Sequence, residues 1–329
     1  MAEIRAMSSS RWGVLGCAVL SALLVACAHT PRASDRPPLA TGEHERVLNG
    51  VRLYYRVAGE ASAWRAPVLF LHGGPGYNSY SFARLMGPRL EKSQRMVYLD
   101  QRGCGRSERP WDGRYSLEVL VADLEALRQQ LGVERWVLLG HSFGGTLALE
   151  YAARYPKHVA GVVFVSGFSD ASASFSTWKS ELEHQYPGRL AETATPEDGS
   201  DYERVMRALQ GLDAQAFFHS LQFRNALYVQ MQEAVDAESG LYNTGELSRT
   251  LFATELPVYR FSDAERLTVP VLVIGGRYDQ SVGLESMKAL AKALPRATLL
   301  EYEESGHFPY LEEADRFERD VSHFLSSLP

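Results

Sequence analysis

The sequence Gly140-His141-Ser142-Phe143-Gly144-Gly145 places a serine in a glycine-rich segment. It follows the apolar run 135–139 and precedes a helical pattern, which predicts a strand, a sharp turn and a helix. Gly140 and Gly144 let strand and helix approach closely, and the first N–H groups of the helix point at the turn. A dinucleotide-binding loop would need glycine where Ser142 stands. The pattern therefore predicts that Ser142 is a nucleophile.

Other apolar runs share the character of the one before Ser142. Because they are rich in β-branched residues without polar alternation, they indicate strands covered on both faces. They alternate with helical patterns, so we expect a mostly parallel central sheet with helices on both faces. The runs are 67–71, 95–99, 161–165, 269–274 and 298–302, the helical patterns include 116–131 and 146–155, and residues 45–57 alternate as an antiparallel edge hairpin does.

The alternation of strands and helices is interrupted once. Residues 170–263 contain helical, polar and aromatic segments but no buried strand, and such a length is far too long for a loop. We expect residues 45–169 and 264–329 to form the core and residues 170–263 to form a helical cap over the strand ends.

A serine hydroxyl is a poor nucleophile until a base takes its proton. The expected chain order is serine, acid, histidine, and Asp279 and His307 follow the last two apolar runs. His307 is the predicted general base, and Asp279 would hold its imidazole in the right tautomer. Asp170, which follows the run 161–165, is the alternative acid. His141 cannot easily face the hydroxyl of its neighbour.

Acyl transfer also needs two N–H donors at the place where an oxyanion forms. The loop His72-Gly-Gly-Pro-Gly76 follows the first buried run, and its missing side chains allow close approach. We predict that the N–H groups of Gly74 and Phe143 form the oxyanion hole, with Gly73 as the alternative to Gly74. His72 is expected to support its own loop.

The segment Asp100-Gln-Arg-Gly-Cys-Gly-Arg-Ser107 has a predicted structural role. Arg102 and Asp100 can form a charge-assisted network that shapes the loop beside the oxyanion hole. Cys104 is interpreted as a small buried thiol, with a second nucleophile as the alternative. No cluster has the spacing of metal ligands, so we expect neither a metal nor a cofactor.

The composition narrows the possible partners. The chain has 329 residues, of which 45% are hydrophobic and 22% charged, and its formal net charge is −6. A mildly acidic balance argues against nucleic acid as a partner, since phosphate binding needs a basic face.

The N-terminal segment resembles an export signal. Arg5 and Arg11 precede the uncharged apolar run 12–26, which is short for a membrane span. The run ends in Leu24-Val-Ala-Cys27, which resembles the lipobox of bacterial lipoproteins. We therefore expect a signal peptide at 1–26, lipidation of Cys27, a linker at 27–44, and a membrane lipoprotein facing the periplasm. The alternatives are plain cleavage near Ala28 and a retained anchor.

Taken together, HGGPG at 72–76, DQRGCGRS at 100–107, the serine turn, Asp279 and His307 resemble the proline iminopeptidase family of α/β-hydrolases. The resemblance covers residues 45–328 apart from most of the cap. It implies an α/β-hydrolase fold and release of an N-terminal residue, typically proline, from short peptides through an acyl-enzyme. It also implies that acidic side chains of the cap hold the free amine of the substrate.

Two features depart from the family pattern. Family members usually carry a glycine before the serine and a tryptophan after it, whereas this chain has His141 and Phe143. The cap lacks the tryptophan–glutamate pattern of the family, although Glu233, Glu238 and Glu246 could bind an amine. The GHSFGG form is common among relatives that act on esters, lactones or amides. An esterase, lactonase or amidase using the same three residues is therefore the alternative function.

Overall fold

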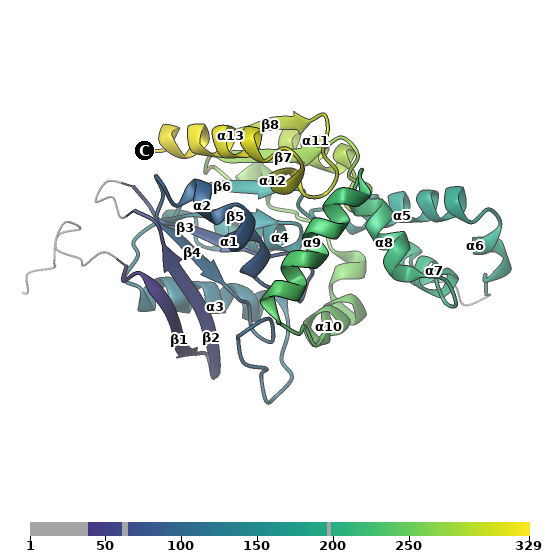
Figure 1. Cartoon of the computed structure of the whole chain (residues 1–329), viewed down its shortest axis with the longest axis horizontal. Helices are drawn as coiled ribbons and strands as arrows, with labels where there is room; N and C mark the ends of the chain where they lie inside the picture. The colour runs from purple at the N-terminus through teal and green to yellow at the C-terminus, as the bar shows by residue number, and fades with distance from the viewer. Residues whose placement is uncertain (1–38, 61–64, 196–198) are drawn as a thin grey trace, which may run out of the picture. The chain divides into compact units, whose positions relative to one another are not determined.

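A computed structural model describes residues 39–60, 65–195 and 199–329. The predicted signal peptide and Cys27 lie outside these residues. The described strands form one sheet in the order β1-β2-β4-β3-β5-β6-β7-β8 (Figure 1). The strands are β1 (Gly42–Leu48), β2 (Val51–Ala58), β3 (Val68–Leu71), β4 (Met96–Leu99), β5 (Trp136–His141), β6 (Val159–Val165), β7 (Val271–Gly276) and β8 (Ala297–Tyr302).

The register of the sheet confirms the expected topology. Strands β3 to β8 are parallel, with β5 paired to β3 on one side and to β6 on the other. The antiparallel pair β1–β2 turns between Leu48 and Val51, which confirms the edge hairpin. Because parallel strands end at the same edge, the segments that follow β3, β5, β7 and β8 can meet there.

Helices cover both faces of the sheet, as expected. Along β5, Leu138 packs into one core cluster while Val137 and Leu139 pack into the other, because successive strand residues point to opposite faces. The first cluster contains residues of α3, α4 and α11, and the second contains residues of α1, α2, α12 and α13. These helices are α1 (Tyr80–Leu85), α2 (Gly87–Leu90), α3 (Leu117–Gln130), α4 (Phe143–Arg154), α11 (Leu284–Ala293), α12 (Pro309–Glu312) and α13 (Ala314–Ser327).

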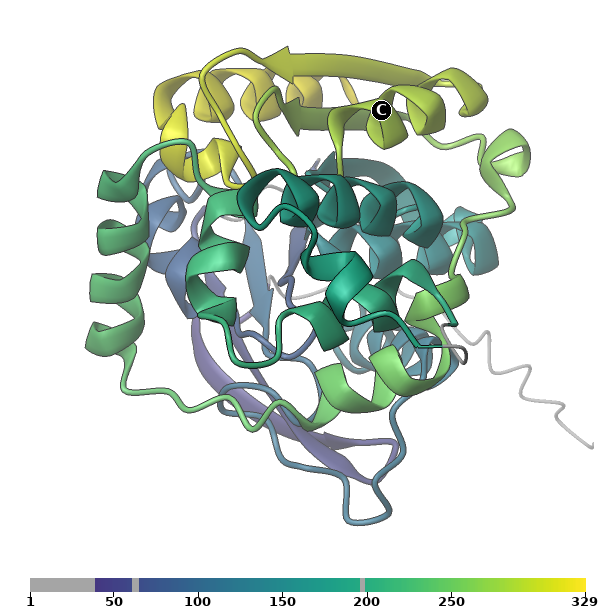
Figure 2. The ribbon, with the colours of Figure 1, turned by 90° about the vertical axis from the view of Figure 1, so that its right-hand side faces the viewer.

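The segment 170–263, called the insertion below, is helical between β6 and β7. Its helices are α5 (Ala171–Gln185), α6 (Arg189–Glu192), α7 (Asp201–Ala208), α8 (Ala214–Gln222), α9 (Ala226–Ser239) and α10 (Glu246–Thr254). Side chains at several helix starts accept hydrogen bonds from backbone N–H groups that have no partner within the helix. Asp170 caps α5, Ser200 caps α7 and Asp213 caps α8. Figure 2 shows α5, α8, α9 and α10 in front of the core strands.

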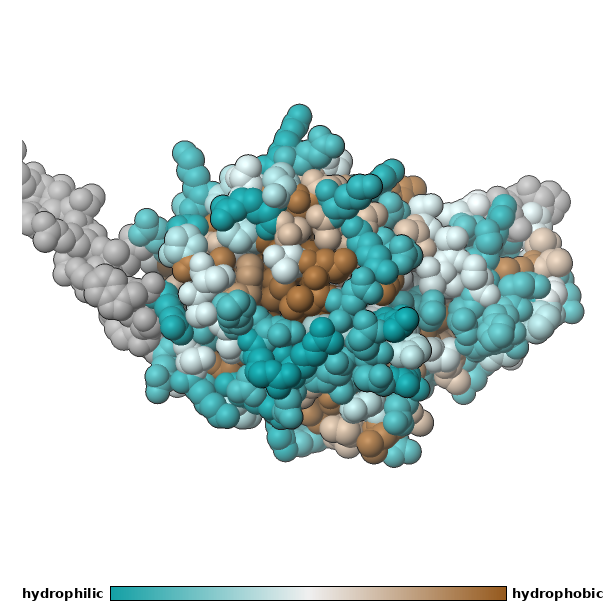
Figure 3. Space-filling view, turned by 90° about the horizontal axis from the view of Figure 1, so that it is seen from above, coloured by the Kyte–Doolittle hydropathy of each residue, from teal (hydrophilic) through white to brown (hydrophobic). Residues whose placement is uncertain are grey.

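The outer surface is largely hydrophilic where α13 and β8 face the viewer, with an apolar area at its centre (Figure 3). Within 39–60, 65–195 and 199–329, no helix is long and apolar enough to cross a membrane.

Candidate active site

Ser142 lies on the turn between β5 and α4 with a strained backbone. Its φ of 53° and ψ of −122° fall in a region that residues other than glycine rarely adopt. The turn is held by bonds on both sides: Ser142 N donates to Val165 O at 2.9 Å, and Ser142 O accepts from Gly145 N at 2.8 Å. A side chain at Gly144 would collide with the carbonyl group of Leu71, so the helix can only start there with glycine. The predicted strand–turn–helix around Ser142 is therefore present.

His307 and Asp279 form a buried pair on the loops after β8 and β7. The His307 Nδ1 atom lies 2.9 Å from Asp279 Oδ2, and both side chains are almost fully buried. The second oxygen of Asp279 accepts from Ser281 N at 2.9 Å and Val282 N at 3.2 Å. Because an ionised carboxylate only accepts, the Nδ1–H of His307 is the donor, which leaves Nε2 with a lone pair. The ring therefore has the tautomer that a general base requires.

The alternative acid, Asp170, has a different role in the structure. Its carboxylate accepts from Ala173 N at 3.1 Å as the cap of α5, and it lies 3.4 Å from Arg260 Nε. Asp279 is the carboxylate that contacts His307.

His141 connects the serine turn with the loop of His307. Its Nε2–H donates to the His307 carbonyl at 2.8 Å, and the two rings lie 4.8 Å apart between centroids. Burial lowers the pKa of His141 well below its ordinary value, so the ring stays neutral. The residue before Ser142 in the chain is thus in direct contact with His307. Within the described residues, the Ser142 hydroxyl donates no hydrogen bond to His307, a contact that often tightens only with substrate.

The glycine loop after β3 lies against the serine. A Cβ atom on Gly73 would stand 2.9 Å from Ser142 Cβ, so only glycine permits this approach without displacement. Gly74 is exposed with a φ of 114°. Neither Gly74 N–H nor Phe143 N–H donates to another group of the described residues. The N–H groups of Gly74 and Phe143 stay the predicted oxyanion donors.

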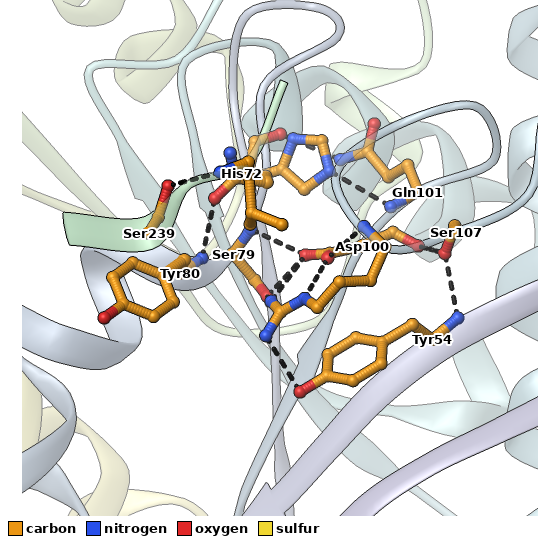
Figure 4. A network of polar contacts seen from close by, with 11 residues as sticks. Tyr54, His72, Ser79, Tyr80, Asp100, Gln101, Ser107 and Ser239 are labelled. Atoms are coloured by element: carbon orange, nitrogen blue, oxygen red, sulfur yellow. Dashed lines mark hydrogen bonds and ion pairs between the residues drawn. The ribbon is translucent and has the colours of Figure 1, made fainter. Parts of the chain in front are cut away.

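His72 supports this loop, as expected. Its Nε2 accepts from Gln101 N at 3.0 Å, and its Nδ1–H donates to Gly73 O at 3.0 Å (Figure 4). Burial lowers the pKa of His72, which keeps the ring neutral and preserves both bonds.

The prediction that Asp100 pairs with Arg102 is wrong. Asp100 instead accepts from Arg106 Nε at 2.7 Å and from the hydroxyl of Ser79 at 2.7 Å, in the network that Figure 4 shows. Burial alone would raise the pKa of Asp100, but the Arg106 guanidinium lowers it below the ordinary value. Arg102 pairs with the buried Asp123, with Nε and Oδ2 2.6 Å apart. The network does shape the segment beside the oxyanion loop, through Ser79.

Cys104 is a buried thiol, as expected. It is 1% exposed, and burial raises its pKa well above the ordinary value, so it is not a thiolate. In the part of the chain that the structure describes, no group of histidine, cysteine and carboxylate side chains could hold a metal ion.

Glu312, which the sequence did not single out, holds the loop of His307. It is 8% exposed, and its Oε2 accepts from Gly306 N at 2.8 Å and Phe308 N at 3.2 Å, on either side of the histidine. The insertion reaches the same loop, because His307 N donates to Gln222 O at 2.7 Å. Such backbone contacts leave no pattern in a sequence.

The carboxylates proposed for amine binding lie in different surroundings. Glu233 is exposed, Glu238 pairs with Arg84 at 2.9 Å, and Glu246 pairs with Arg109. A further acidic side chain of α9, Asp236, is half-buried.

Asp236 lies beside the oxyanion loop. It accepts a hydrogen bond from the hydroxyl of Tyr77, and Tyr77 N donates to Gly73 O at 3.3 Å. Its second donor is Gln232 Nε2 at 3.1 Å. Burial raises the pKa of Asp236, with Glu233 adding to the effect.

Comparison with known proteins agrees with this geometry. Residues 66–314 match the family model described as alpha/beta hydrolase fold. A proline iminopeptidase from Lactobacillus delbrueckii subsp. bulgaricus is 31% identical over 286 residues, covering 83% of this chain and 94% of the relative.

Solved structures show the same likeness. The proline iminopeptidase-related protein from Thermus thermophilus matches with a TM-score of 0.72 and 27% identity, covering 88% of this chain and 98% of that one. An esterase from Rhodococcus sp. ECU1013 shares the fold, with a TM-score of 0.67, 24% identity, and coverage of 88% and 100%. The chain belongs to the proline iminopeptidase-like family of α/β-hydrolases.

Proposed function

We propose that this protein is a serine aminopeptidase that releases N-terminal residues from short peptides. The observation that carries the serine-hydrolase part of the proposal is the buried hydrogen bond between Asp279 and His307, whose loop contacts the neighbour of Ser142 on the strained strand–helix turn. Ser142 acts as nucleophile, His307 as general base, and Asp279 orients the imidazole. The family relationship supports peptide substrates.

The geometry supports an acyl-enzyme mechanism. As Ser142 Oγ attacks the carbonyl carbon, His307 Nε2 takes its proton, while Nδ1–H remains bonded to Asp279. The carbonyl oxygen becomes negatively charged and accepts hydrogen bonds from the N–H groups of Gly74 and Phe143. His307 then gives its proton to the leaving amine. A water molecule, activated by the same ring, hydrolyses the ester on Ser142 and restores the enzyme.

Asp236 is our candidate for the group that binds the free amine of the substrate. It is a half-buried carboxylate beside the oxyanion loop, and no cation pairs with it among the described side chains. An ammonium group placed there would compensate the cost of burying this charge, since a buried charge is stabilised mainly by an opposite partner. Glu233, the neighbouring exposed carboxylate of α9, provides a matched control.

A substrate panel tests the proposal. We expect proline naphthylamide to be hydrolysed faster than its N-acetylated form and faster than nitrophenyl acetate. Asp236→Asn should remove most of the preference for the free amine, whereas Glu233→Gln should retain it. If blocking the amine has no effect and the ester is the best substrate, the protein is an esterase that uses the same three residues.

We also propose that the enzyme is a bacterial lipoprotein anchored through Cys27 and facing the periplasm. The support is the basic start, the uncharged run 12–26 and the sequence Leu24-Val-Ala-Cys27. Multiple acyl chains, as on bacterial lipoproteins, give more stable anchoring than a single chain does.

A further inference from the structure

Glu312 is a buried carboxylate whose hydrogen-bond partners in the described residues are backbone N–H groups. Its Oε2 accepts from Gly306 at 2.8 Å and from Phe308 at 3.2 Å. These two residues flank His307, so one oxygen atom holds the backbone before and after the base. The other oxygen lies 3.5 Å from Arg224 N of the insertion.

The loop that carries His307 is held from several elements: Ser305 Oγ donates to Glu313 at 2.7 Å, and His141 Nε2 donates to the His307 carbonyl at 2.8 Å. It is too short for regular structure between β8 and α12, and its shape follows from what its N–H groups bind. His307 N donates to Gln222 O at 2.7 Å, and the ring of Phe308 stacks on Phe223 with centroids 4.6 Å apart. Glu312 adds the contacts to the N–H groups on either side of His307.

A buried carboxylate is costly to maintain without a positive partner. Burial raises the pKa of Glu312, and the negative charge of Asp279 adds to the effect. The hydrogen bonds from the N–H groups of Gly306 and Phe308 offset part of that cost, and both go to the same oxygen atom.

We propose that Glu312 is a positioning residue for the catalytic base: it fixes the backbone on both sides of His307 and thereby the place of Nε2 relative to Ser142. This inference rests on the proposed role of His307. A displacement of about 1 Å at a reacting group can reduce the rate about 100-fold. Loss of the hydrogen bonds to Glu312 should therefore lower the rate of the chemical step more than it weakens ligand binding.

Two substitutions distinguish the length of the Glu312 side chain from its charge. Glu312→Asp keeps the charge but is one methylene shorter, so it cannot hold both amides at their present distances. Glu312→Gln loses the charge but keeps an oxygen atom that can accept from Gly306 and Phe308. Glu318→Gln is the control, because Glu318 lies on α13 and pairs with Arg89 at 2.8 Å.

The experiment measures inactivation by an alkyl fluorophosphonate, which requires no knowledge of the natural substrate. Ser142 Oγ bonds to phosphorus, fluoride leaves, and His307 takes the hydroxyl proton. The limiting rate constant kinact measures the reactivity of the Ser142 hydroxyl toward the bound probe. The constant KI measures how tightly the probe binds before it reacts. Thermal unfolding of each variant reports the fold.

We expect Glu312→Asp to lower kinact at least about tenfold, with KI changed less than about twofold. Glu312→Gln should stay within about threefold of the wild-type kinact, and Glu318→Gln should match the wild type. Equal kinact in Glu312→Asp and wild type, or a larger loss in Glu312→Gln than in Glu312→Asp, would overturn the inference. Absence of labelling in the wild-type protein would overturn both this inference and the proposed function.

Discussion

Among single residues, the carboxylate that orients His307 has the largest expected effect on catalysis. Asp279 contacts the ring at 2.9 Å, whereas Asp170 caps α5. Asp279→Asn should lower turnover about 10⁴-fold without unfolding the protein, because an amide stabilises the wrong tautomer. Asp170→Asn should leave turnover within about twofold and change stability by less than about 0.5 kcal/mol, because Asn caps a helix about as well as Asp does. The measurement is kcat with the best substrate of the panel, beside thermal unfolding. A damaging Asp170→Asn with a mild Asp279→Asn would show that the acid is misassigned.

The roles of residues that lie in recognisable motifs could be predicted from the sequence. The roles of residues that act by binding backbone N–H groups could not. Ser142, Asp279 and His307 each follow an apolar strand, and strand ends of a parallel sheet converge. Arg102 and Arg106 lie on one irregular segment, and only the path of that segment decides which of them meets Asp100. Glu312 binds N–H groups that every residue type offers, so its role leaves no trace in the sequence.

Among the secondary-structure elements, α3 and α4 are joined by a hydrogen bond to a carboxylate of α3. Glu125 accepts from Arg128 Nη2 at 2.7 Å on its own helix and from Tyr151 hydroxyl at 2.7 Å on α4. Burial alone would raise the pKa of Glu125, but the bonds from Arg128, Tyr151 and Gln129 lower it to about 2.

This shift gives a pH-dependent prediction of stability. A carboxyl group with a lowered folded pKa stabilises the protein above its unfolded pKa, and that contribution is lost as pH falls toward 2. We expect Glu125→Gln to reduce the free energy of unfolding by about 1–3 kcal/mol at pH 7. The difference from wild type should shrink between about pH 4.5 and pH 2 in urea denaturation. Glu118→Gln, an exposed change on the same helix, should alter stability by less than about 0.5 kcal/mol. A pH-independent difference for Glu125→Gln would contradict the assignment of the stabilising charge.

The elements themselves were well predicted where the core decides them. The run 135–139 became β5, although the strand continues to His141 because its pairing with β6 extends to Val165. The insertion was predicted only as helical, since its individual helix starts depend on caps such as Ser200 and Asp213. How its α8–α9 connection reaches His307 depends on the tertiary fold.

At the scale of the whole molecule, the enzyme is expected to be tethered to a membrane. If Cys27 is the lipidation site, Cys27→Ser should release the protein from the membrane fraction or stall its processing, because no acyl chains can be attached there. Fractionation of bacteria expressing each form measures this, and Cys104→Ser is the control with the lipid site intact. Equal solubility of wild type and Cys27→Ser would argue against the anchor.

The proposed activity requires Ser142 to be the activated nucleophile. The most direct measurement is mass spectrometry of the protein after reaction with a fluorophosphonate, comparing wild type with Ser142→Ala. The account predicts a single covalent adduct on the peptide that contains Ser142, and no adduct on the folded Ser142→Ala variant. An adduct on another residue, or equal labelling of the folded Ser142→Ala variant, would contradict it.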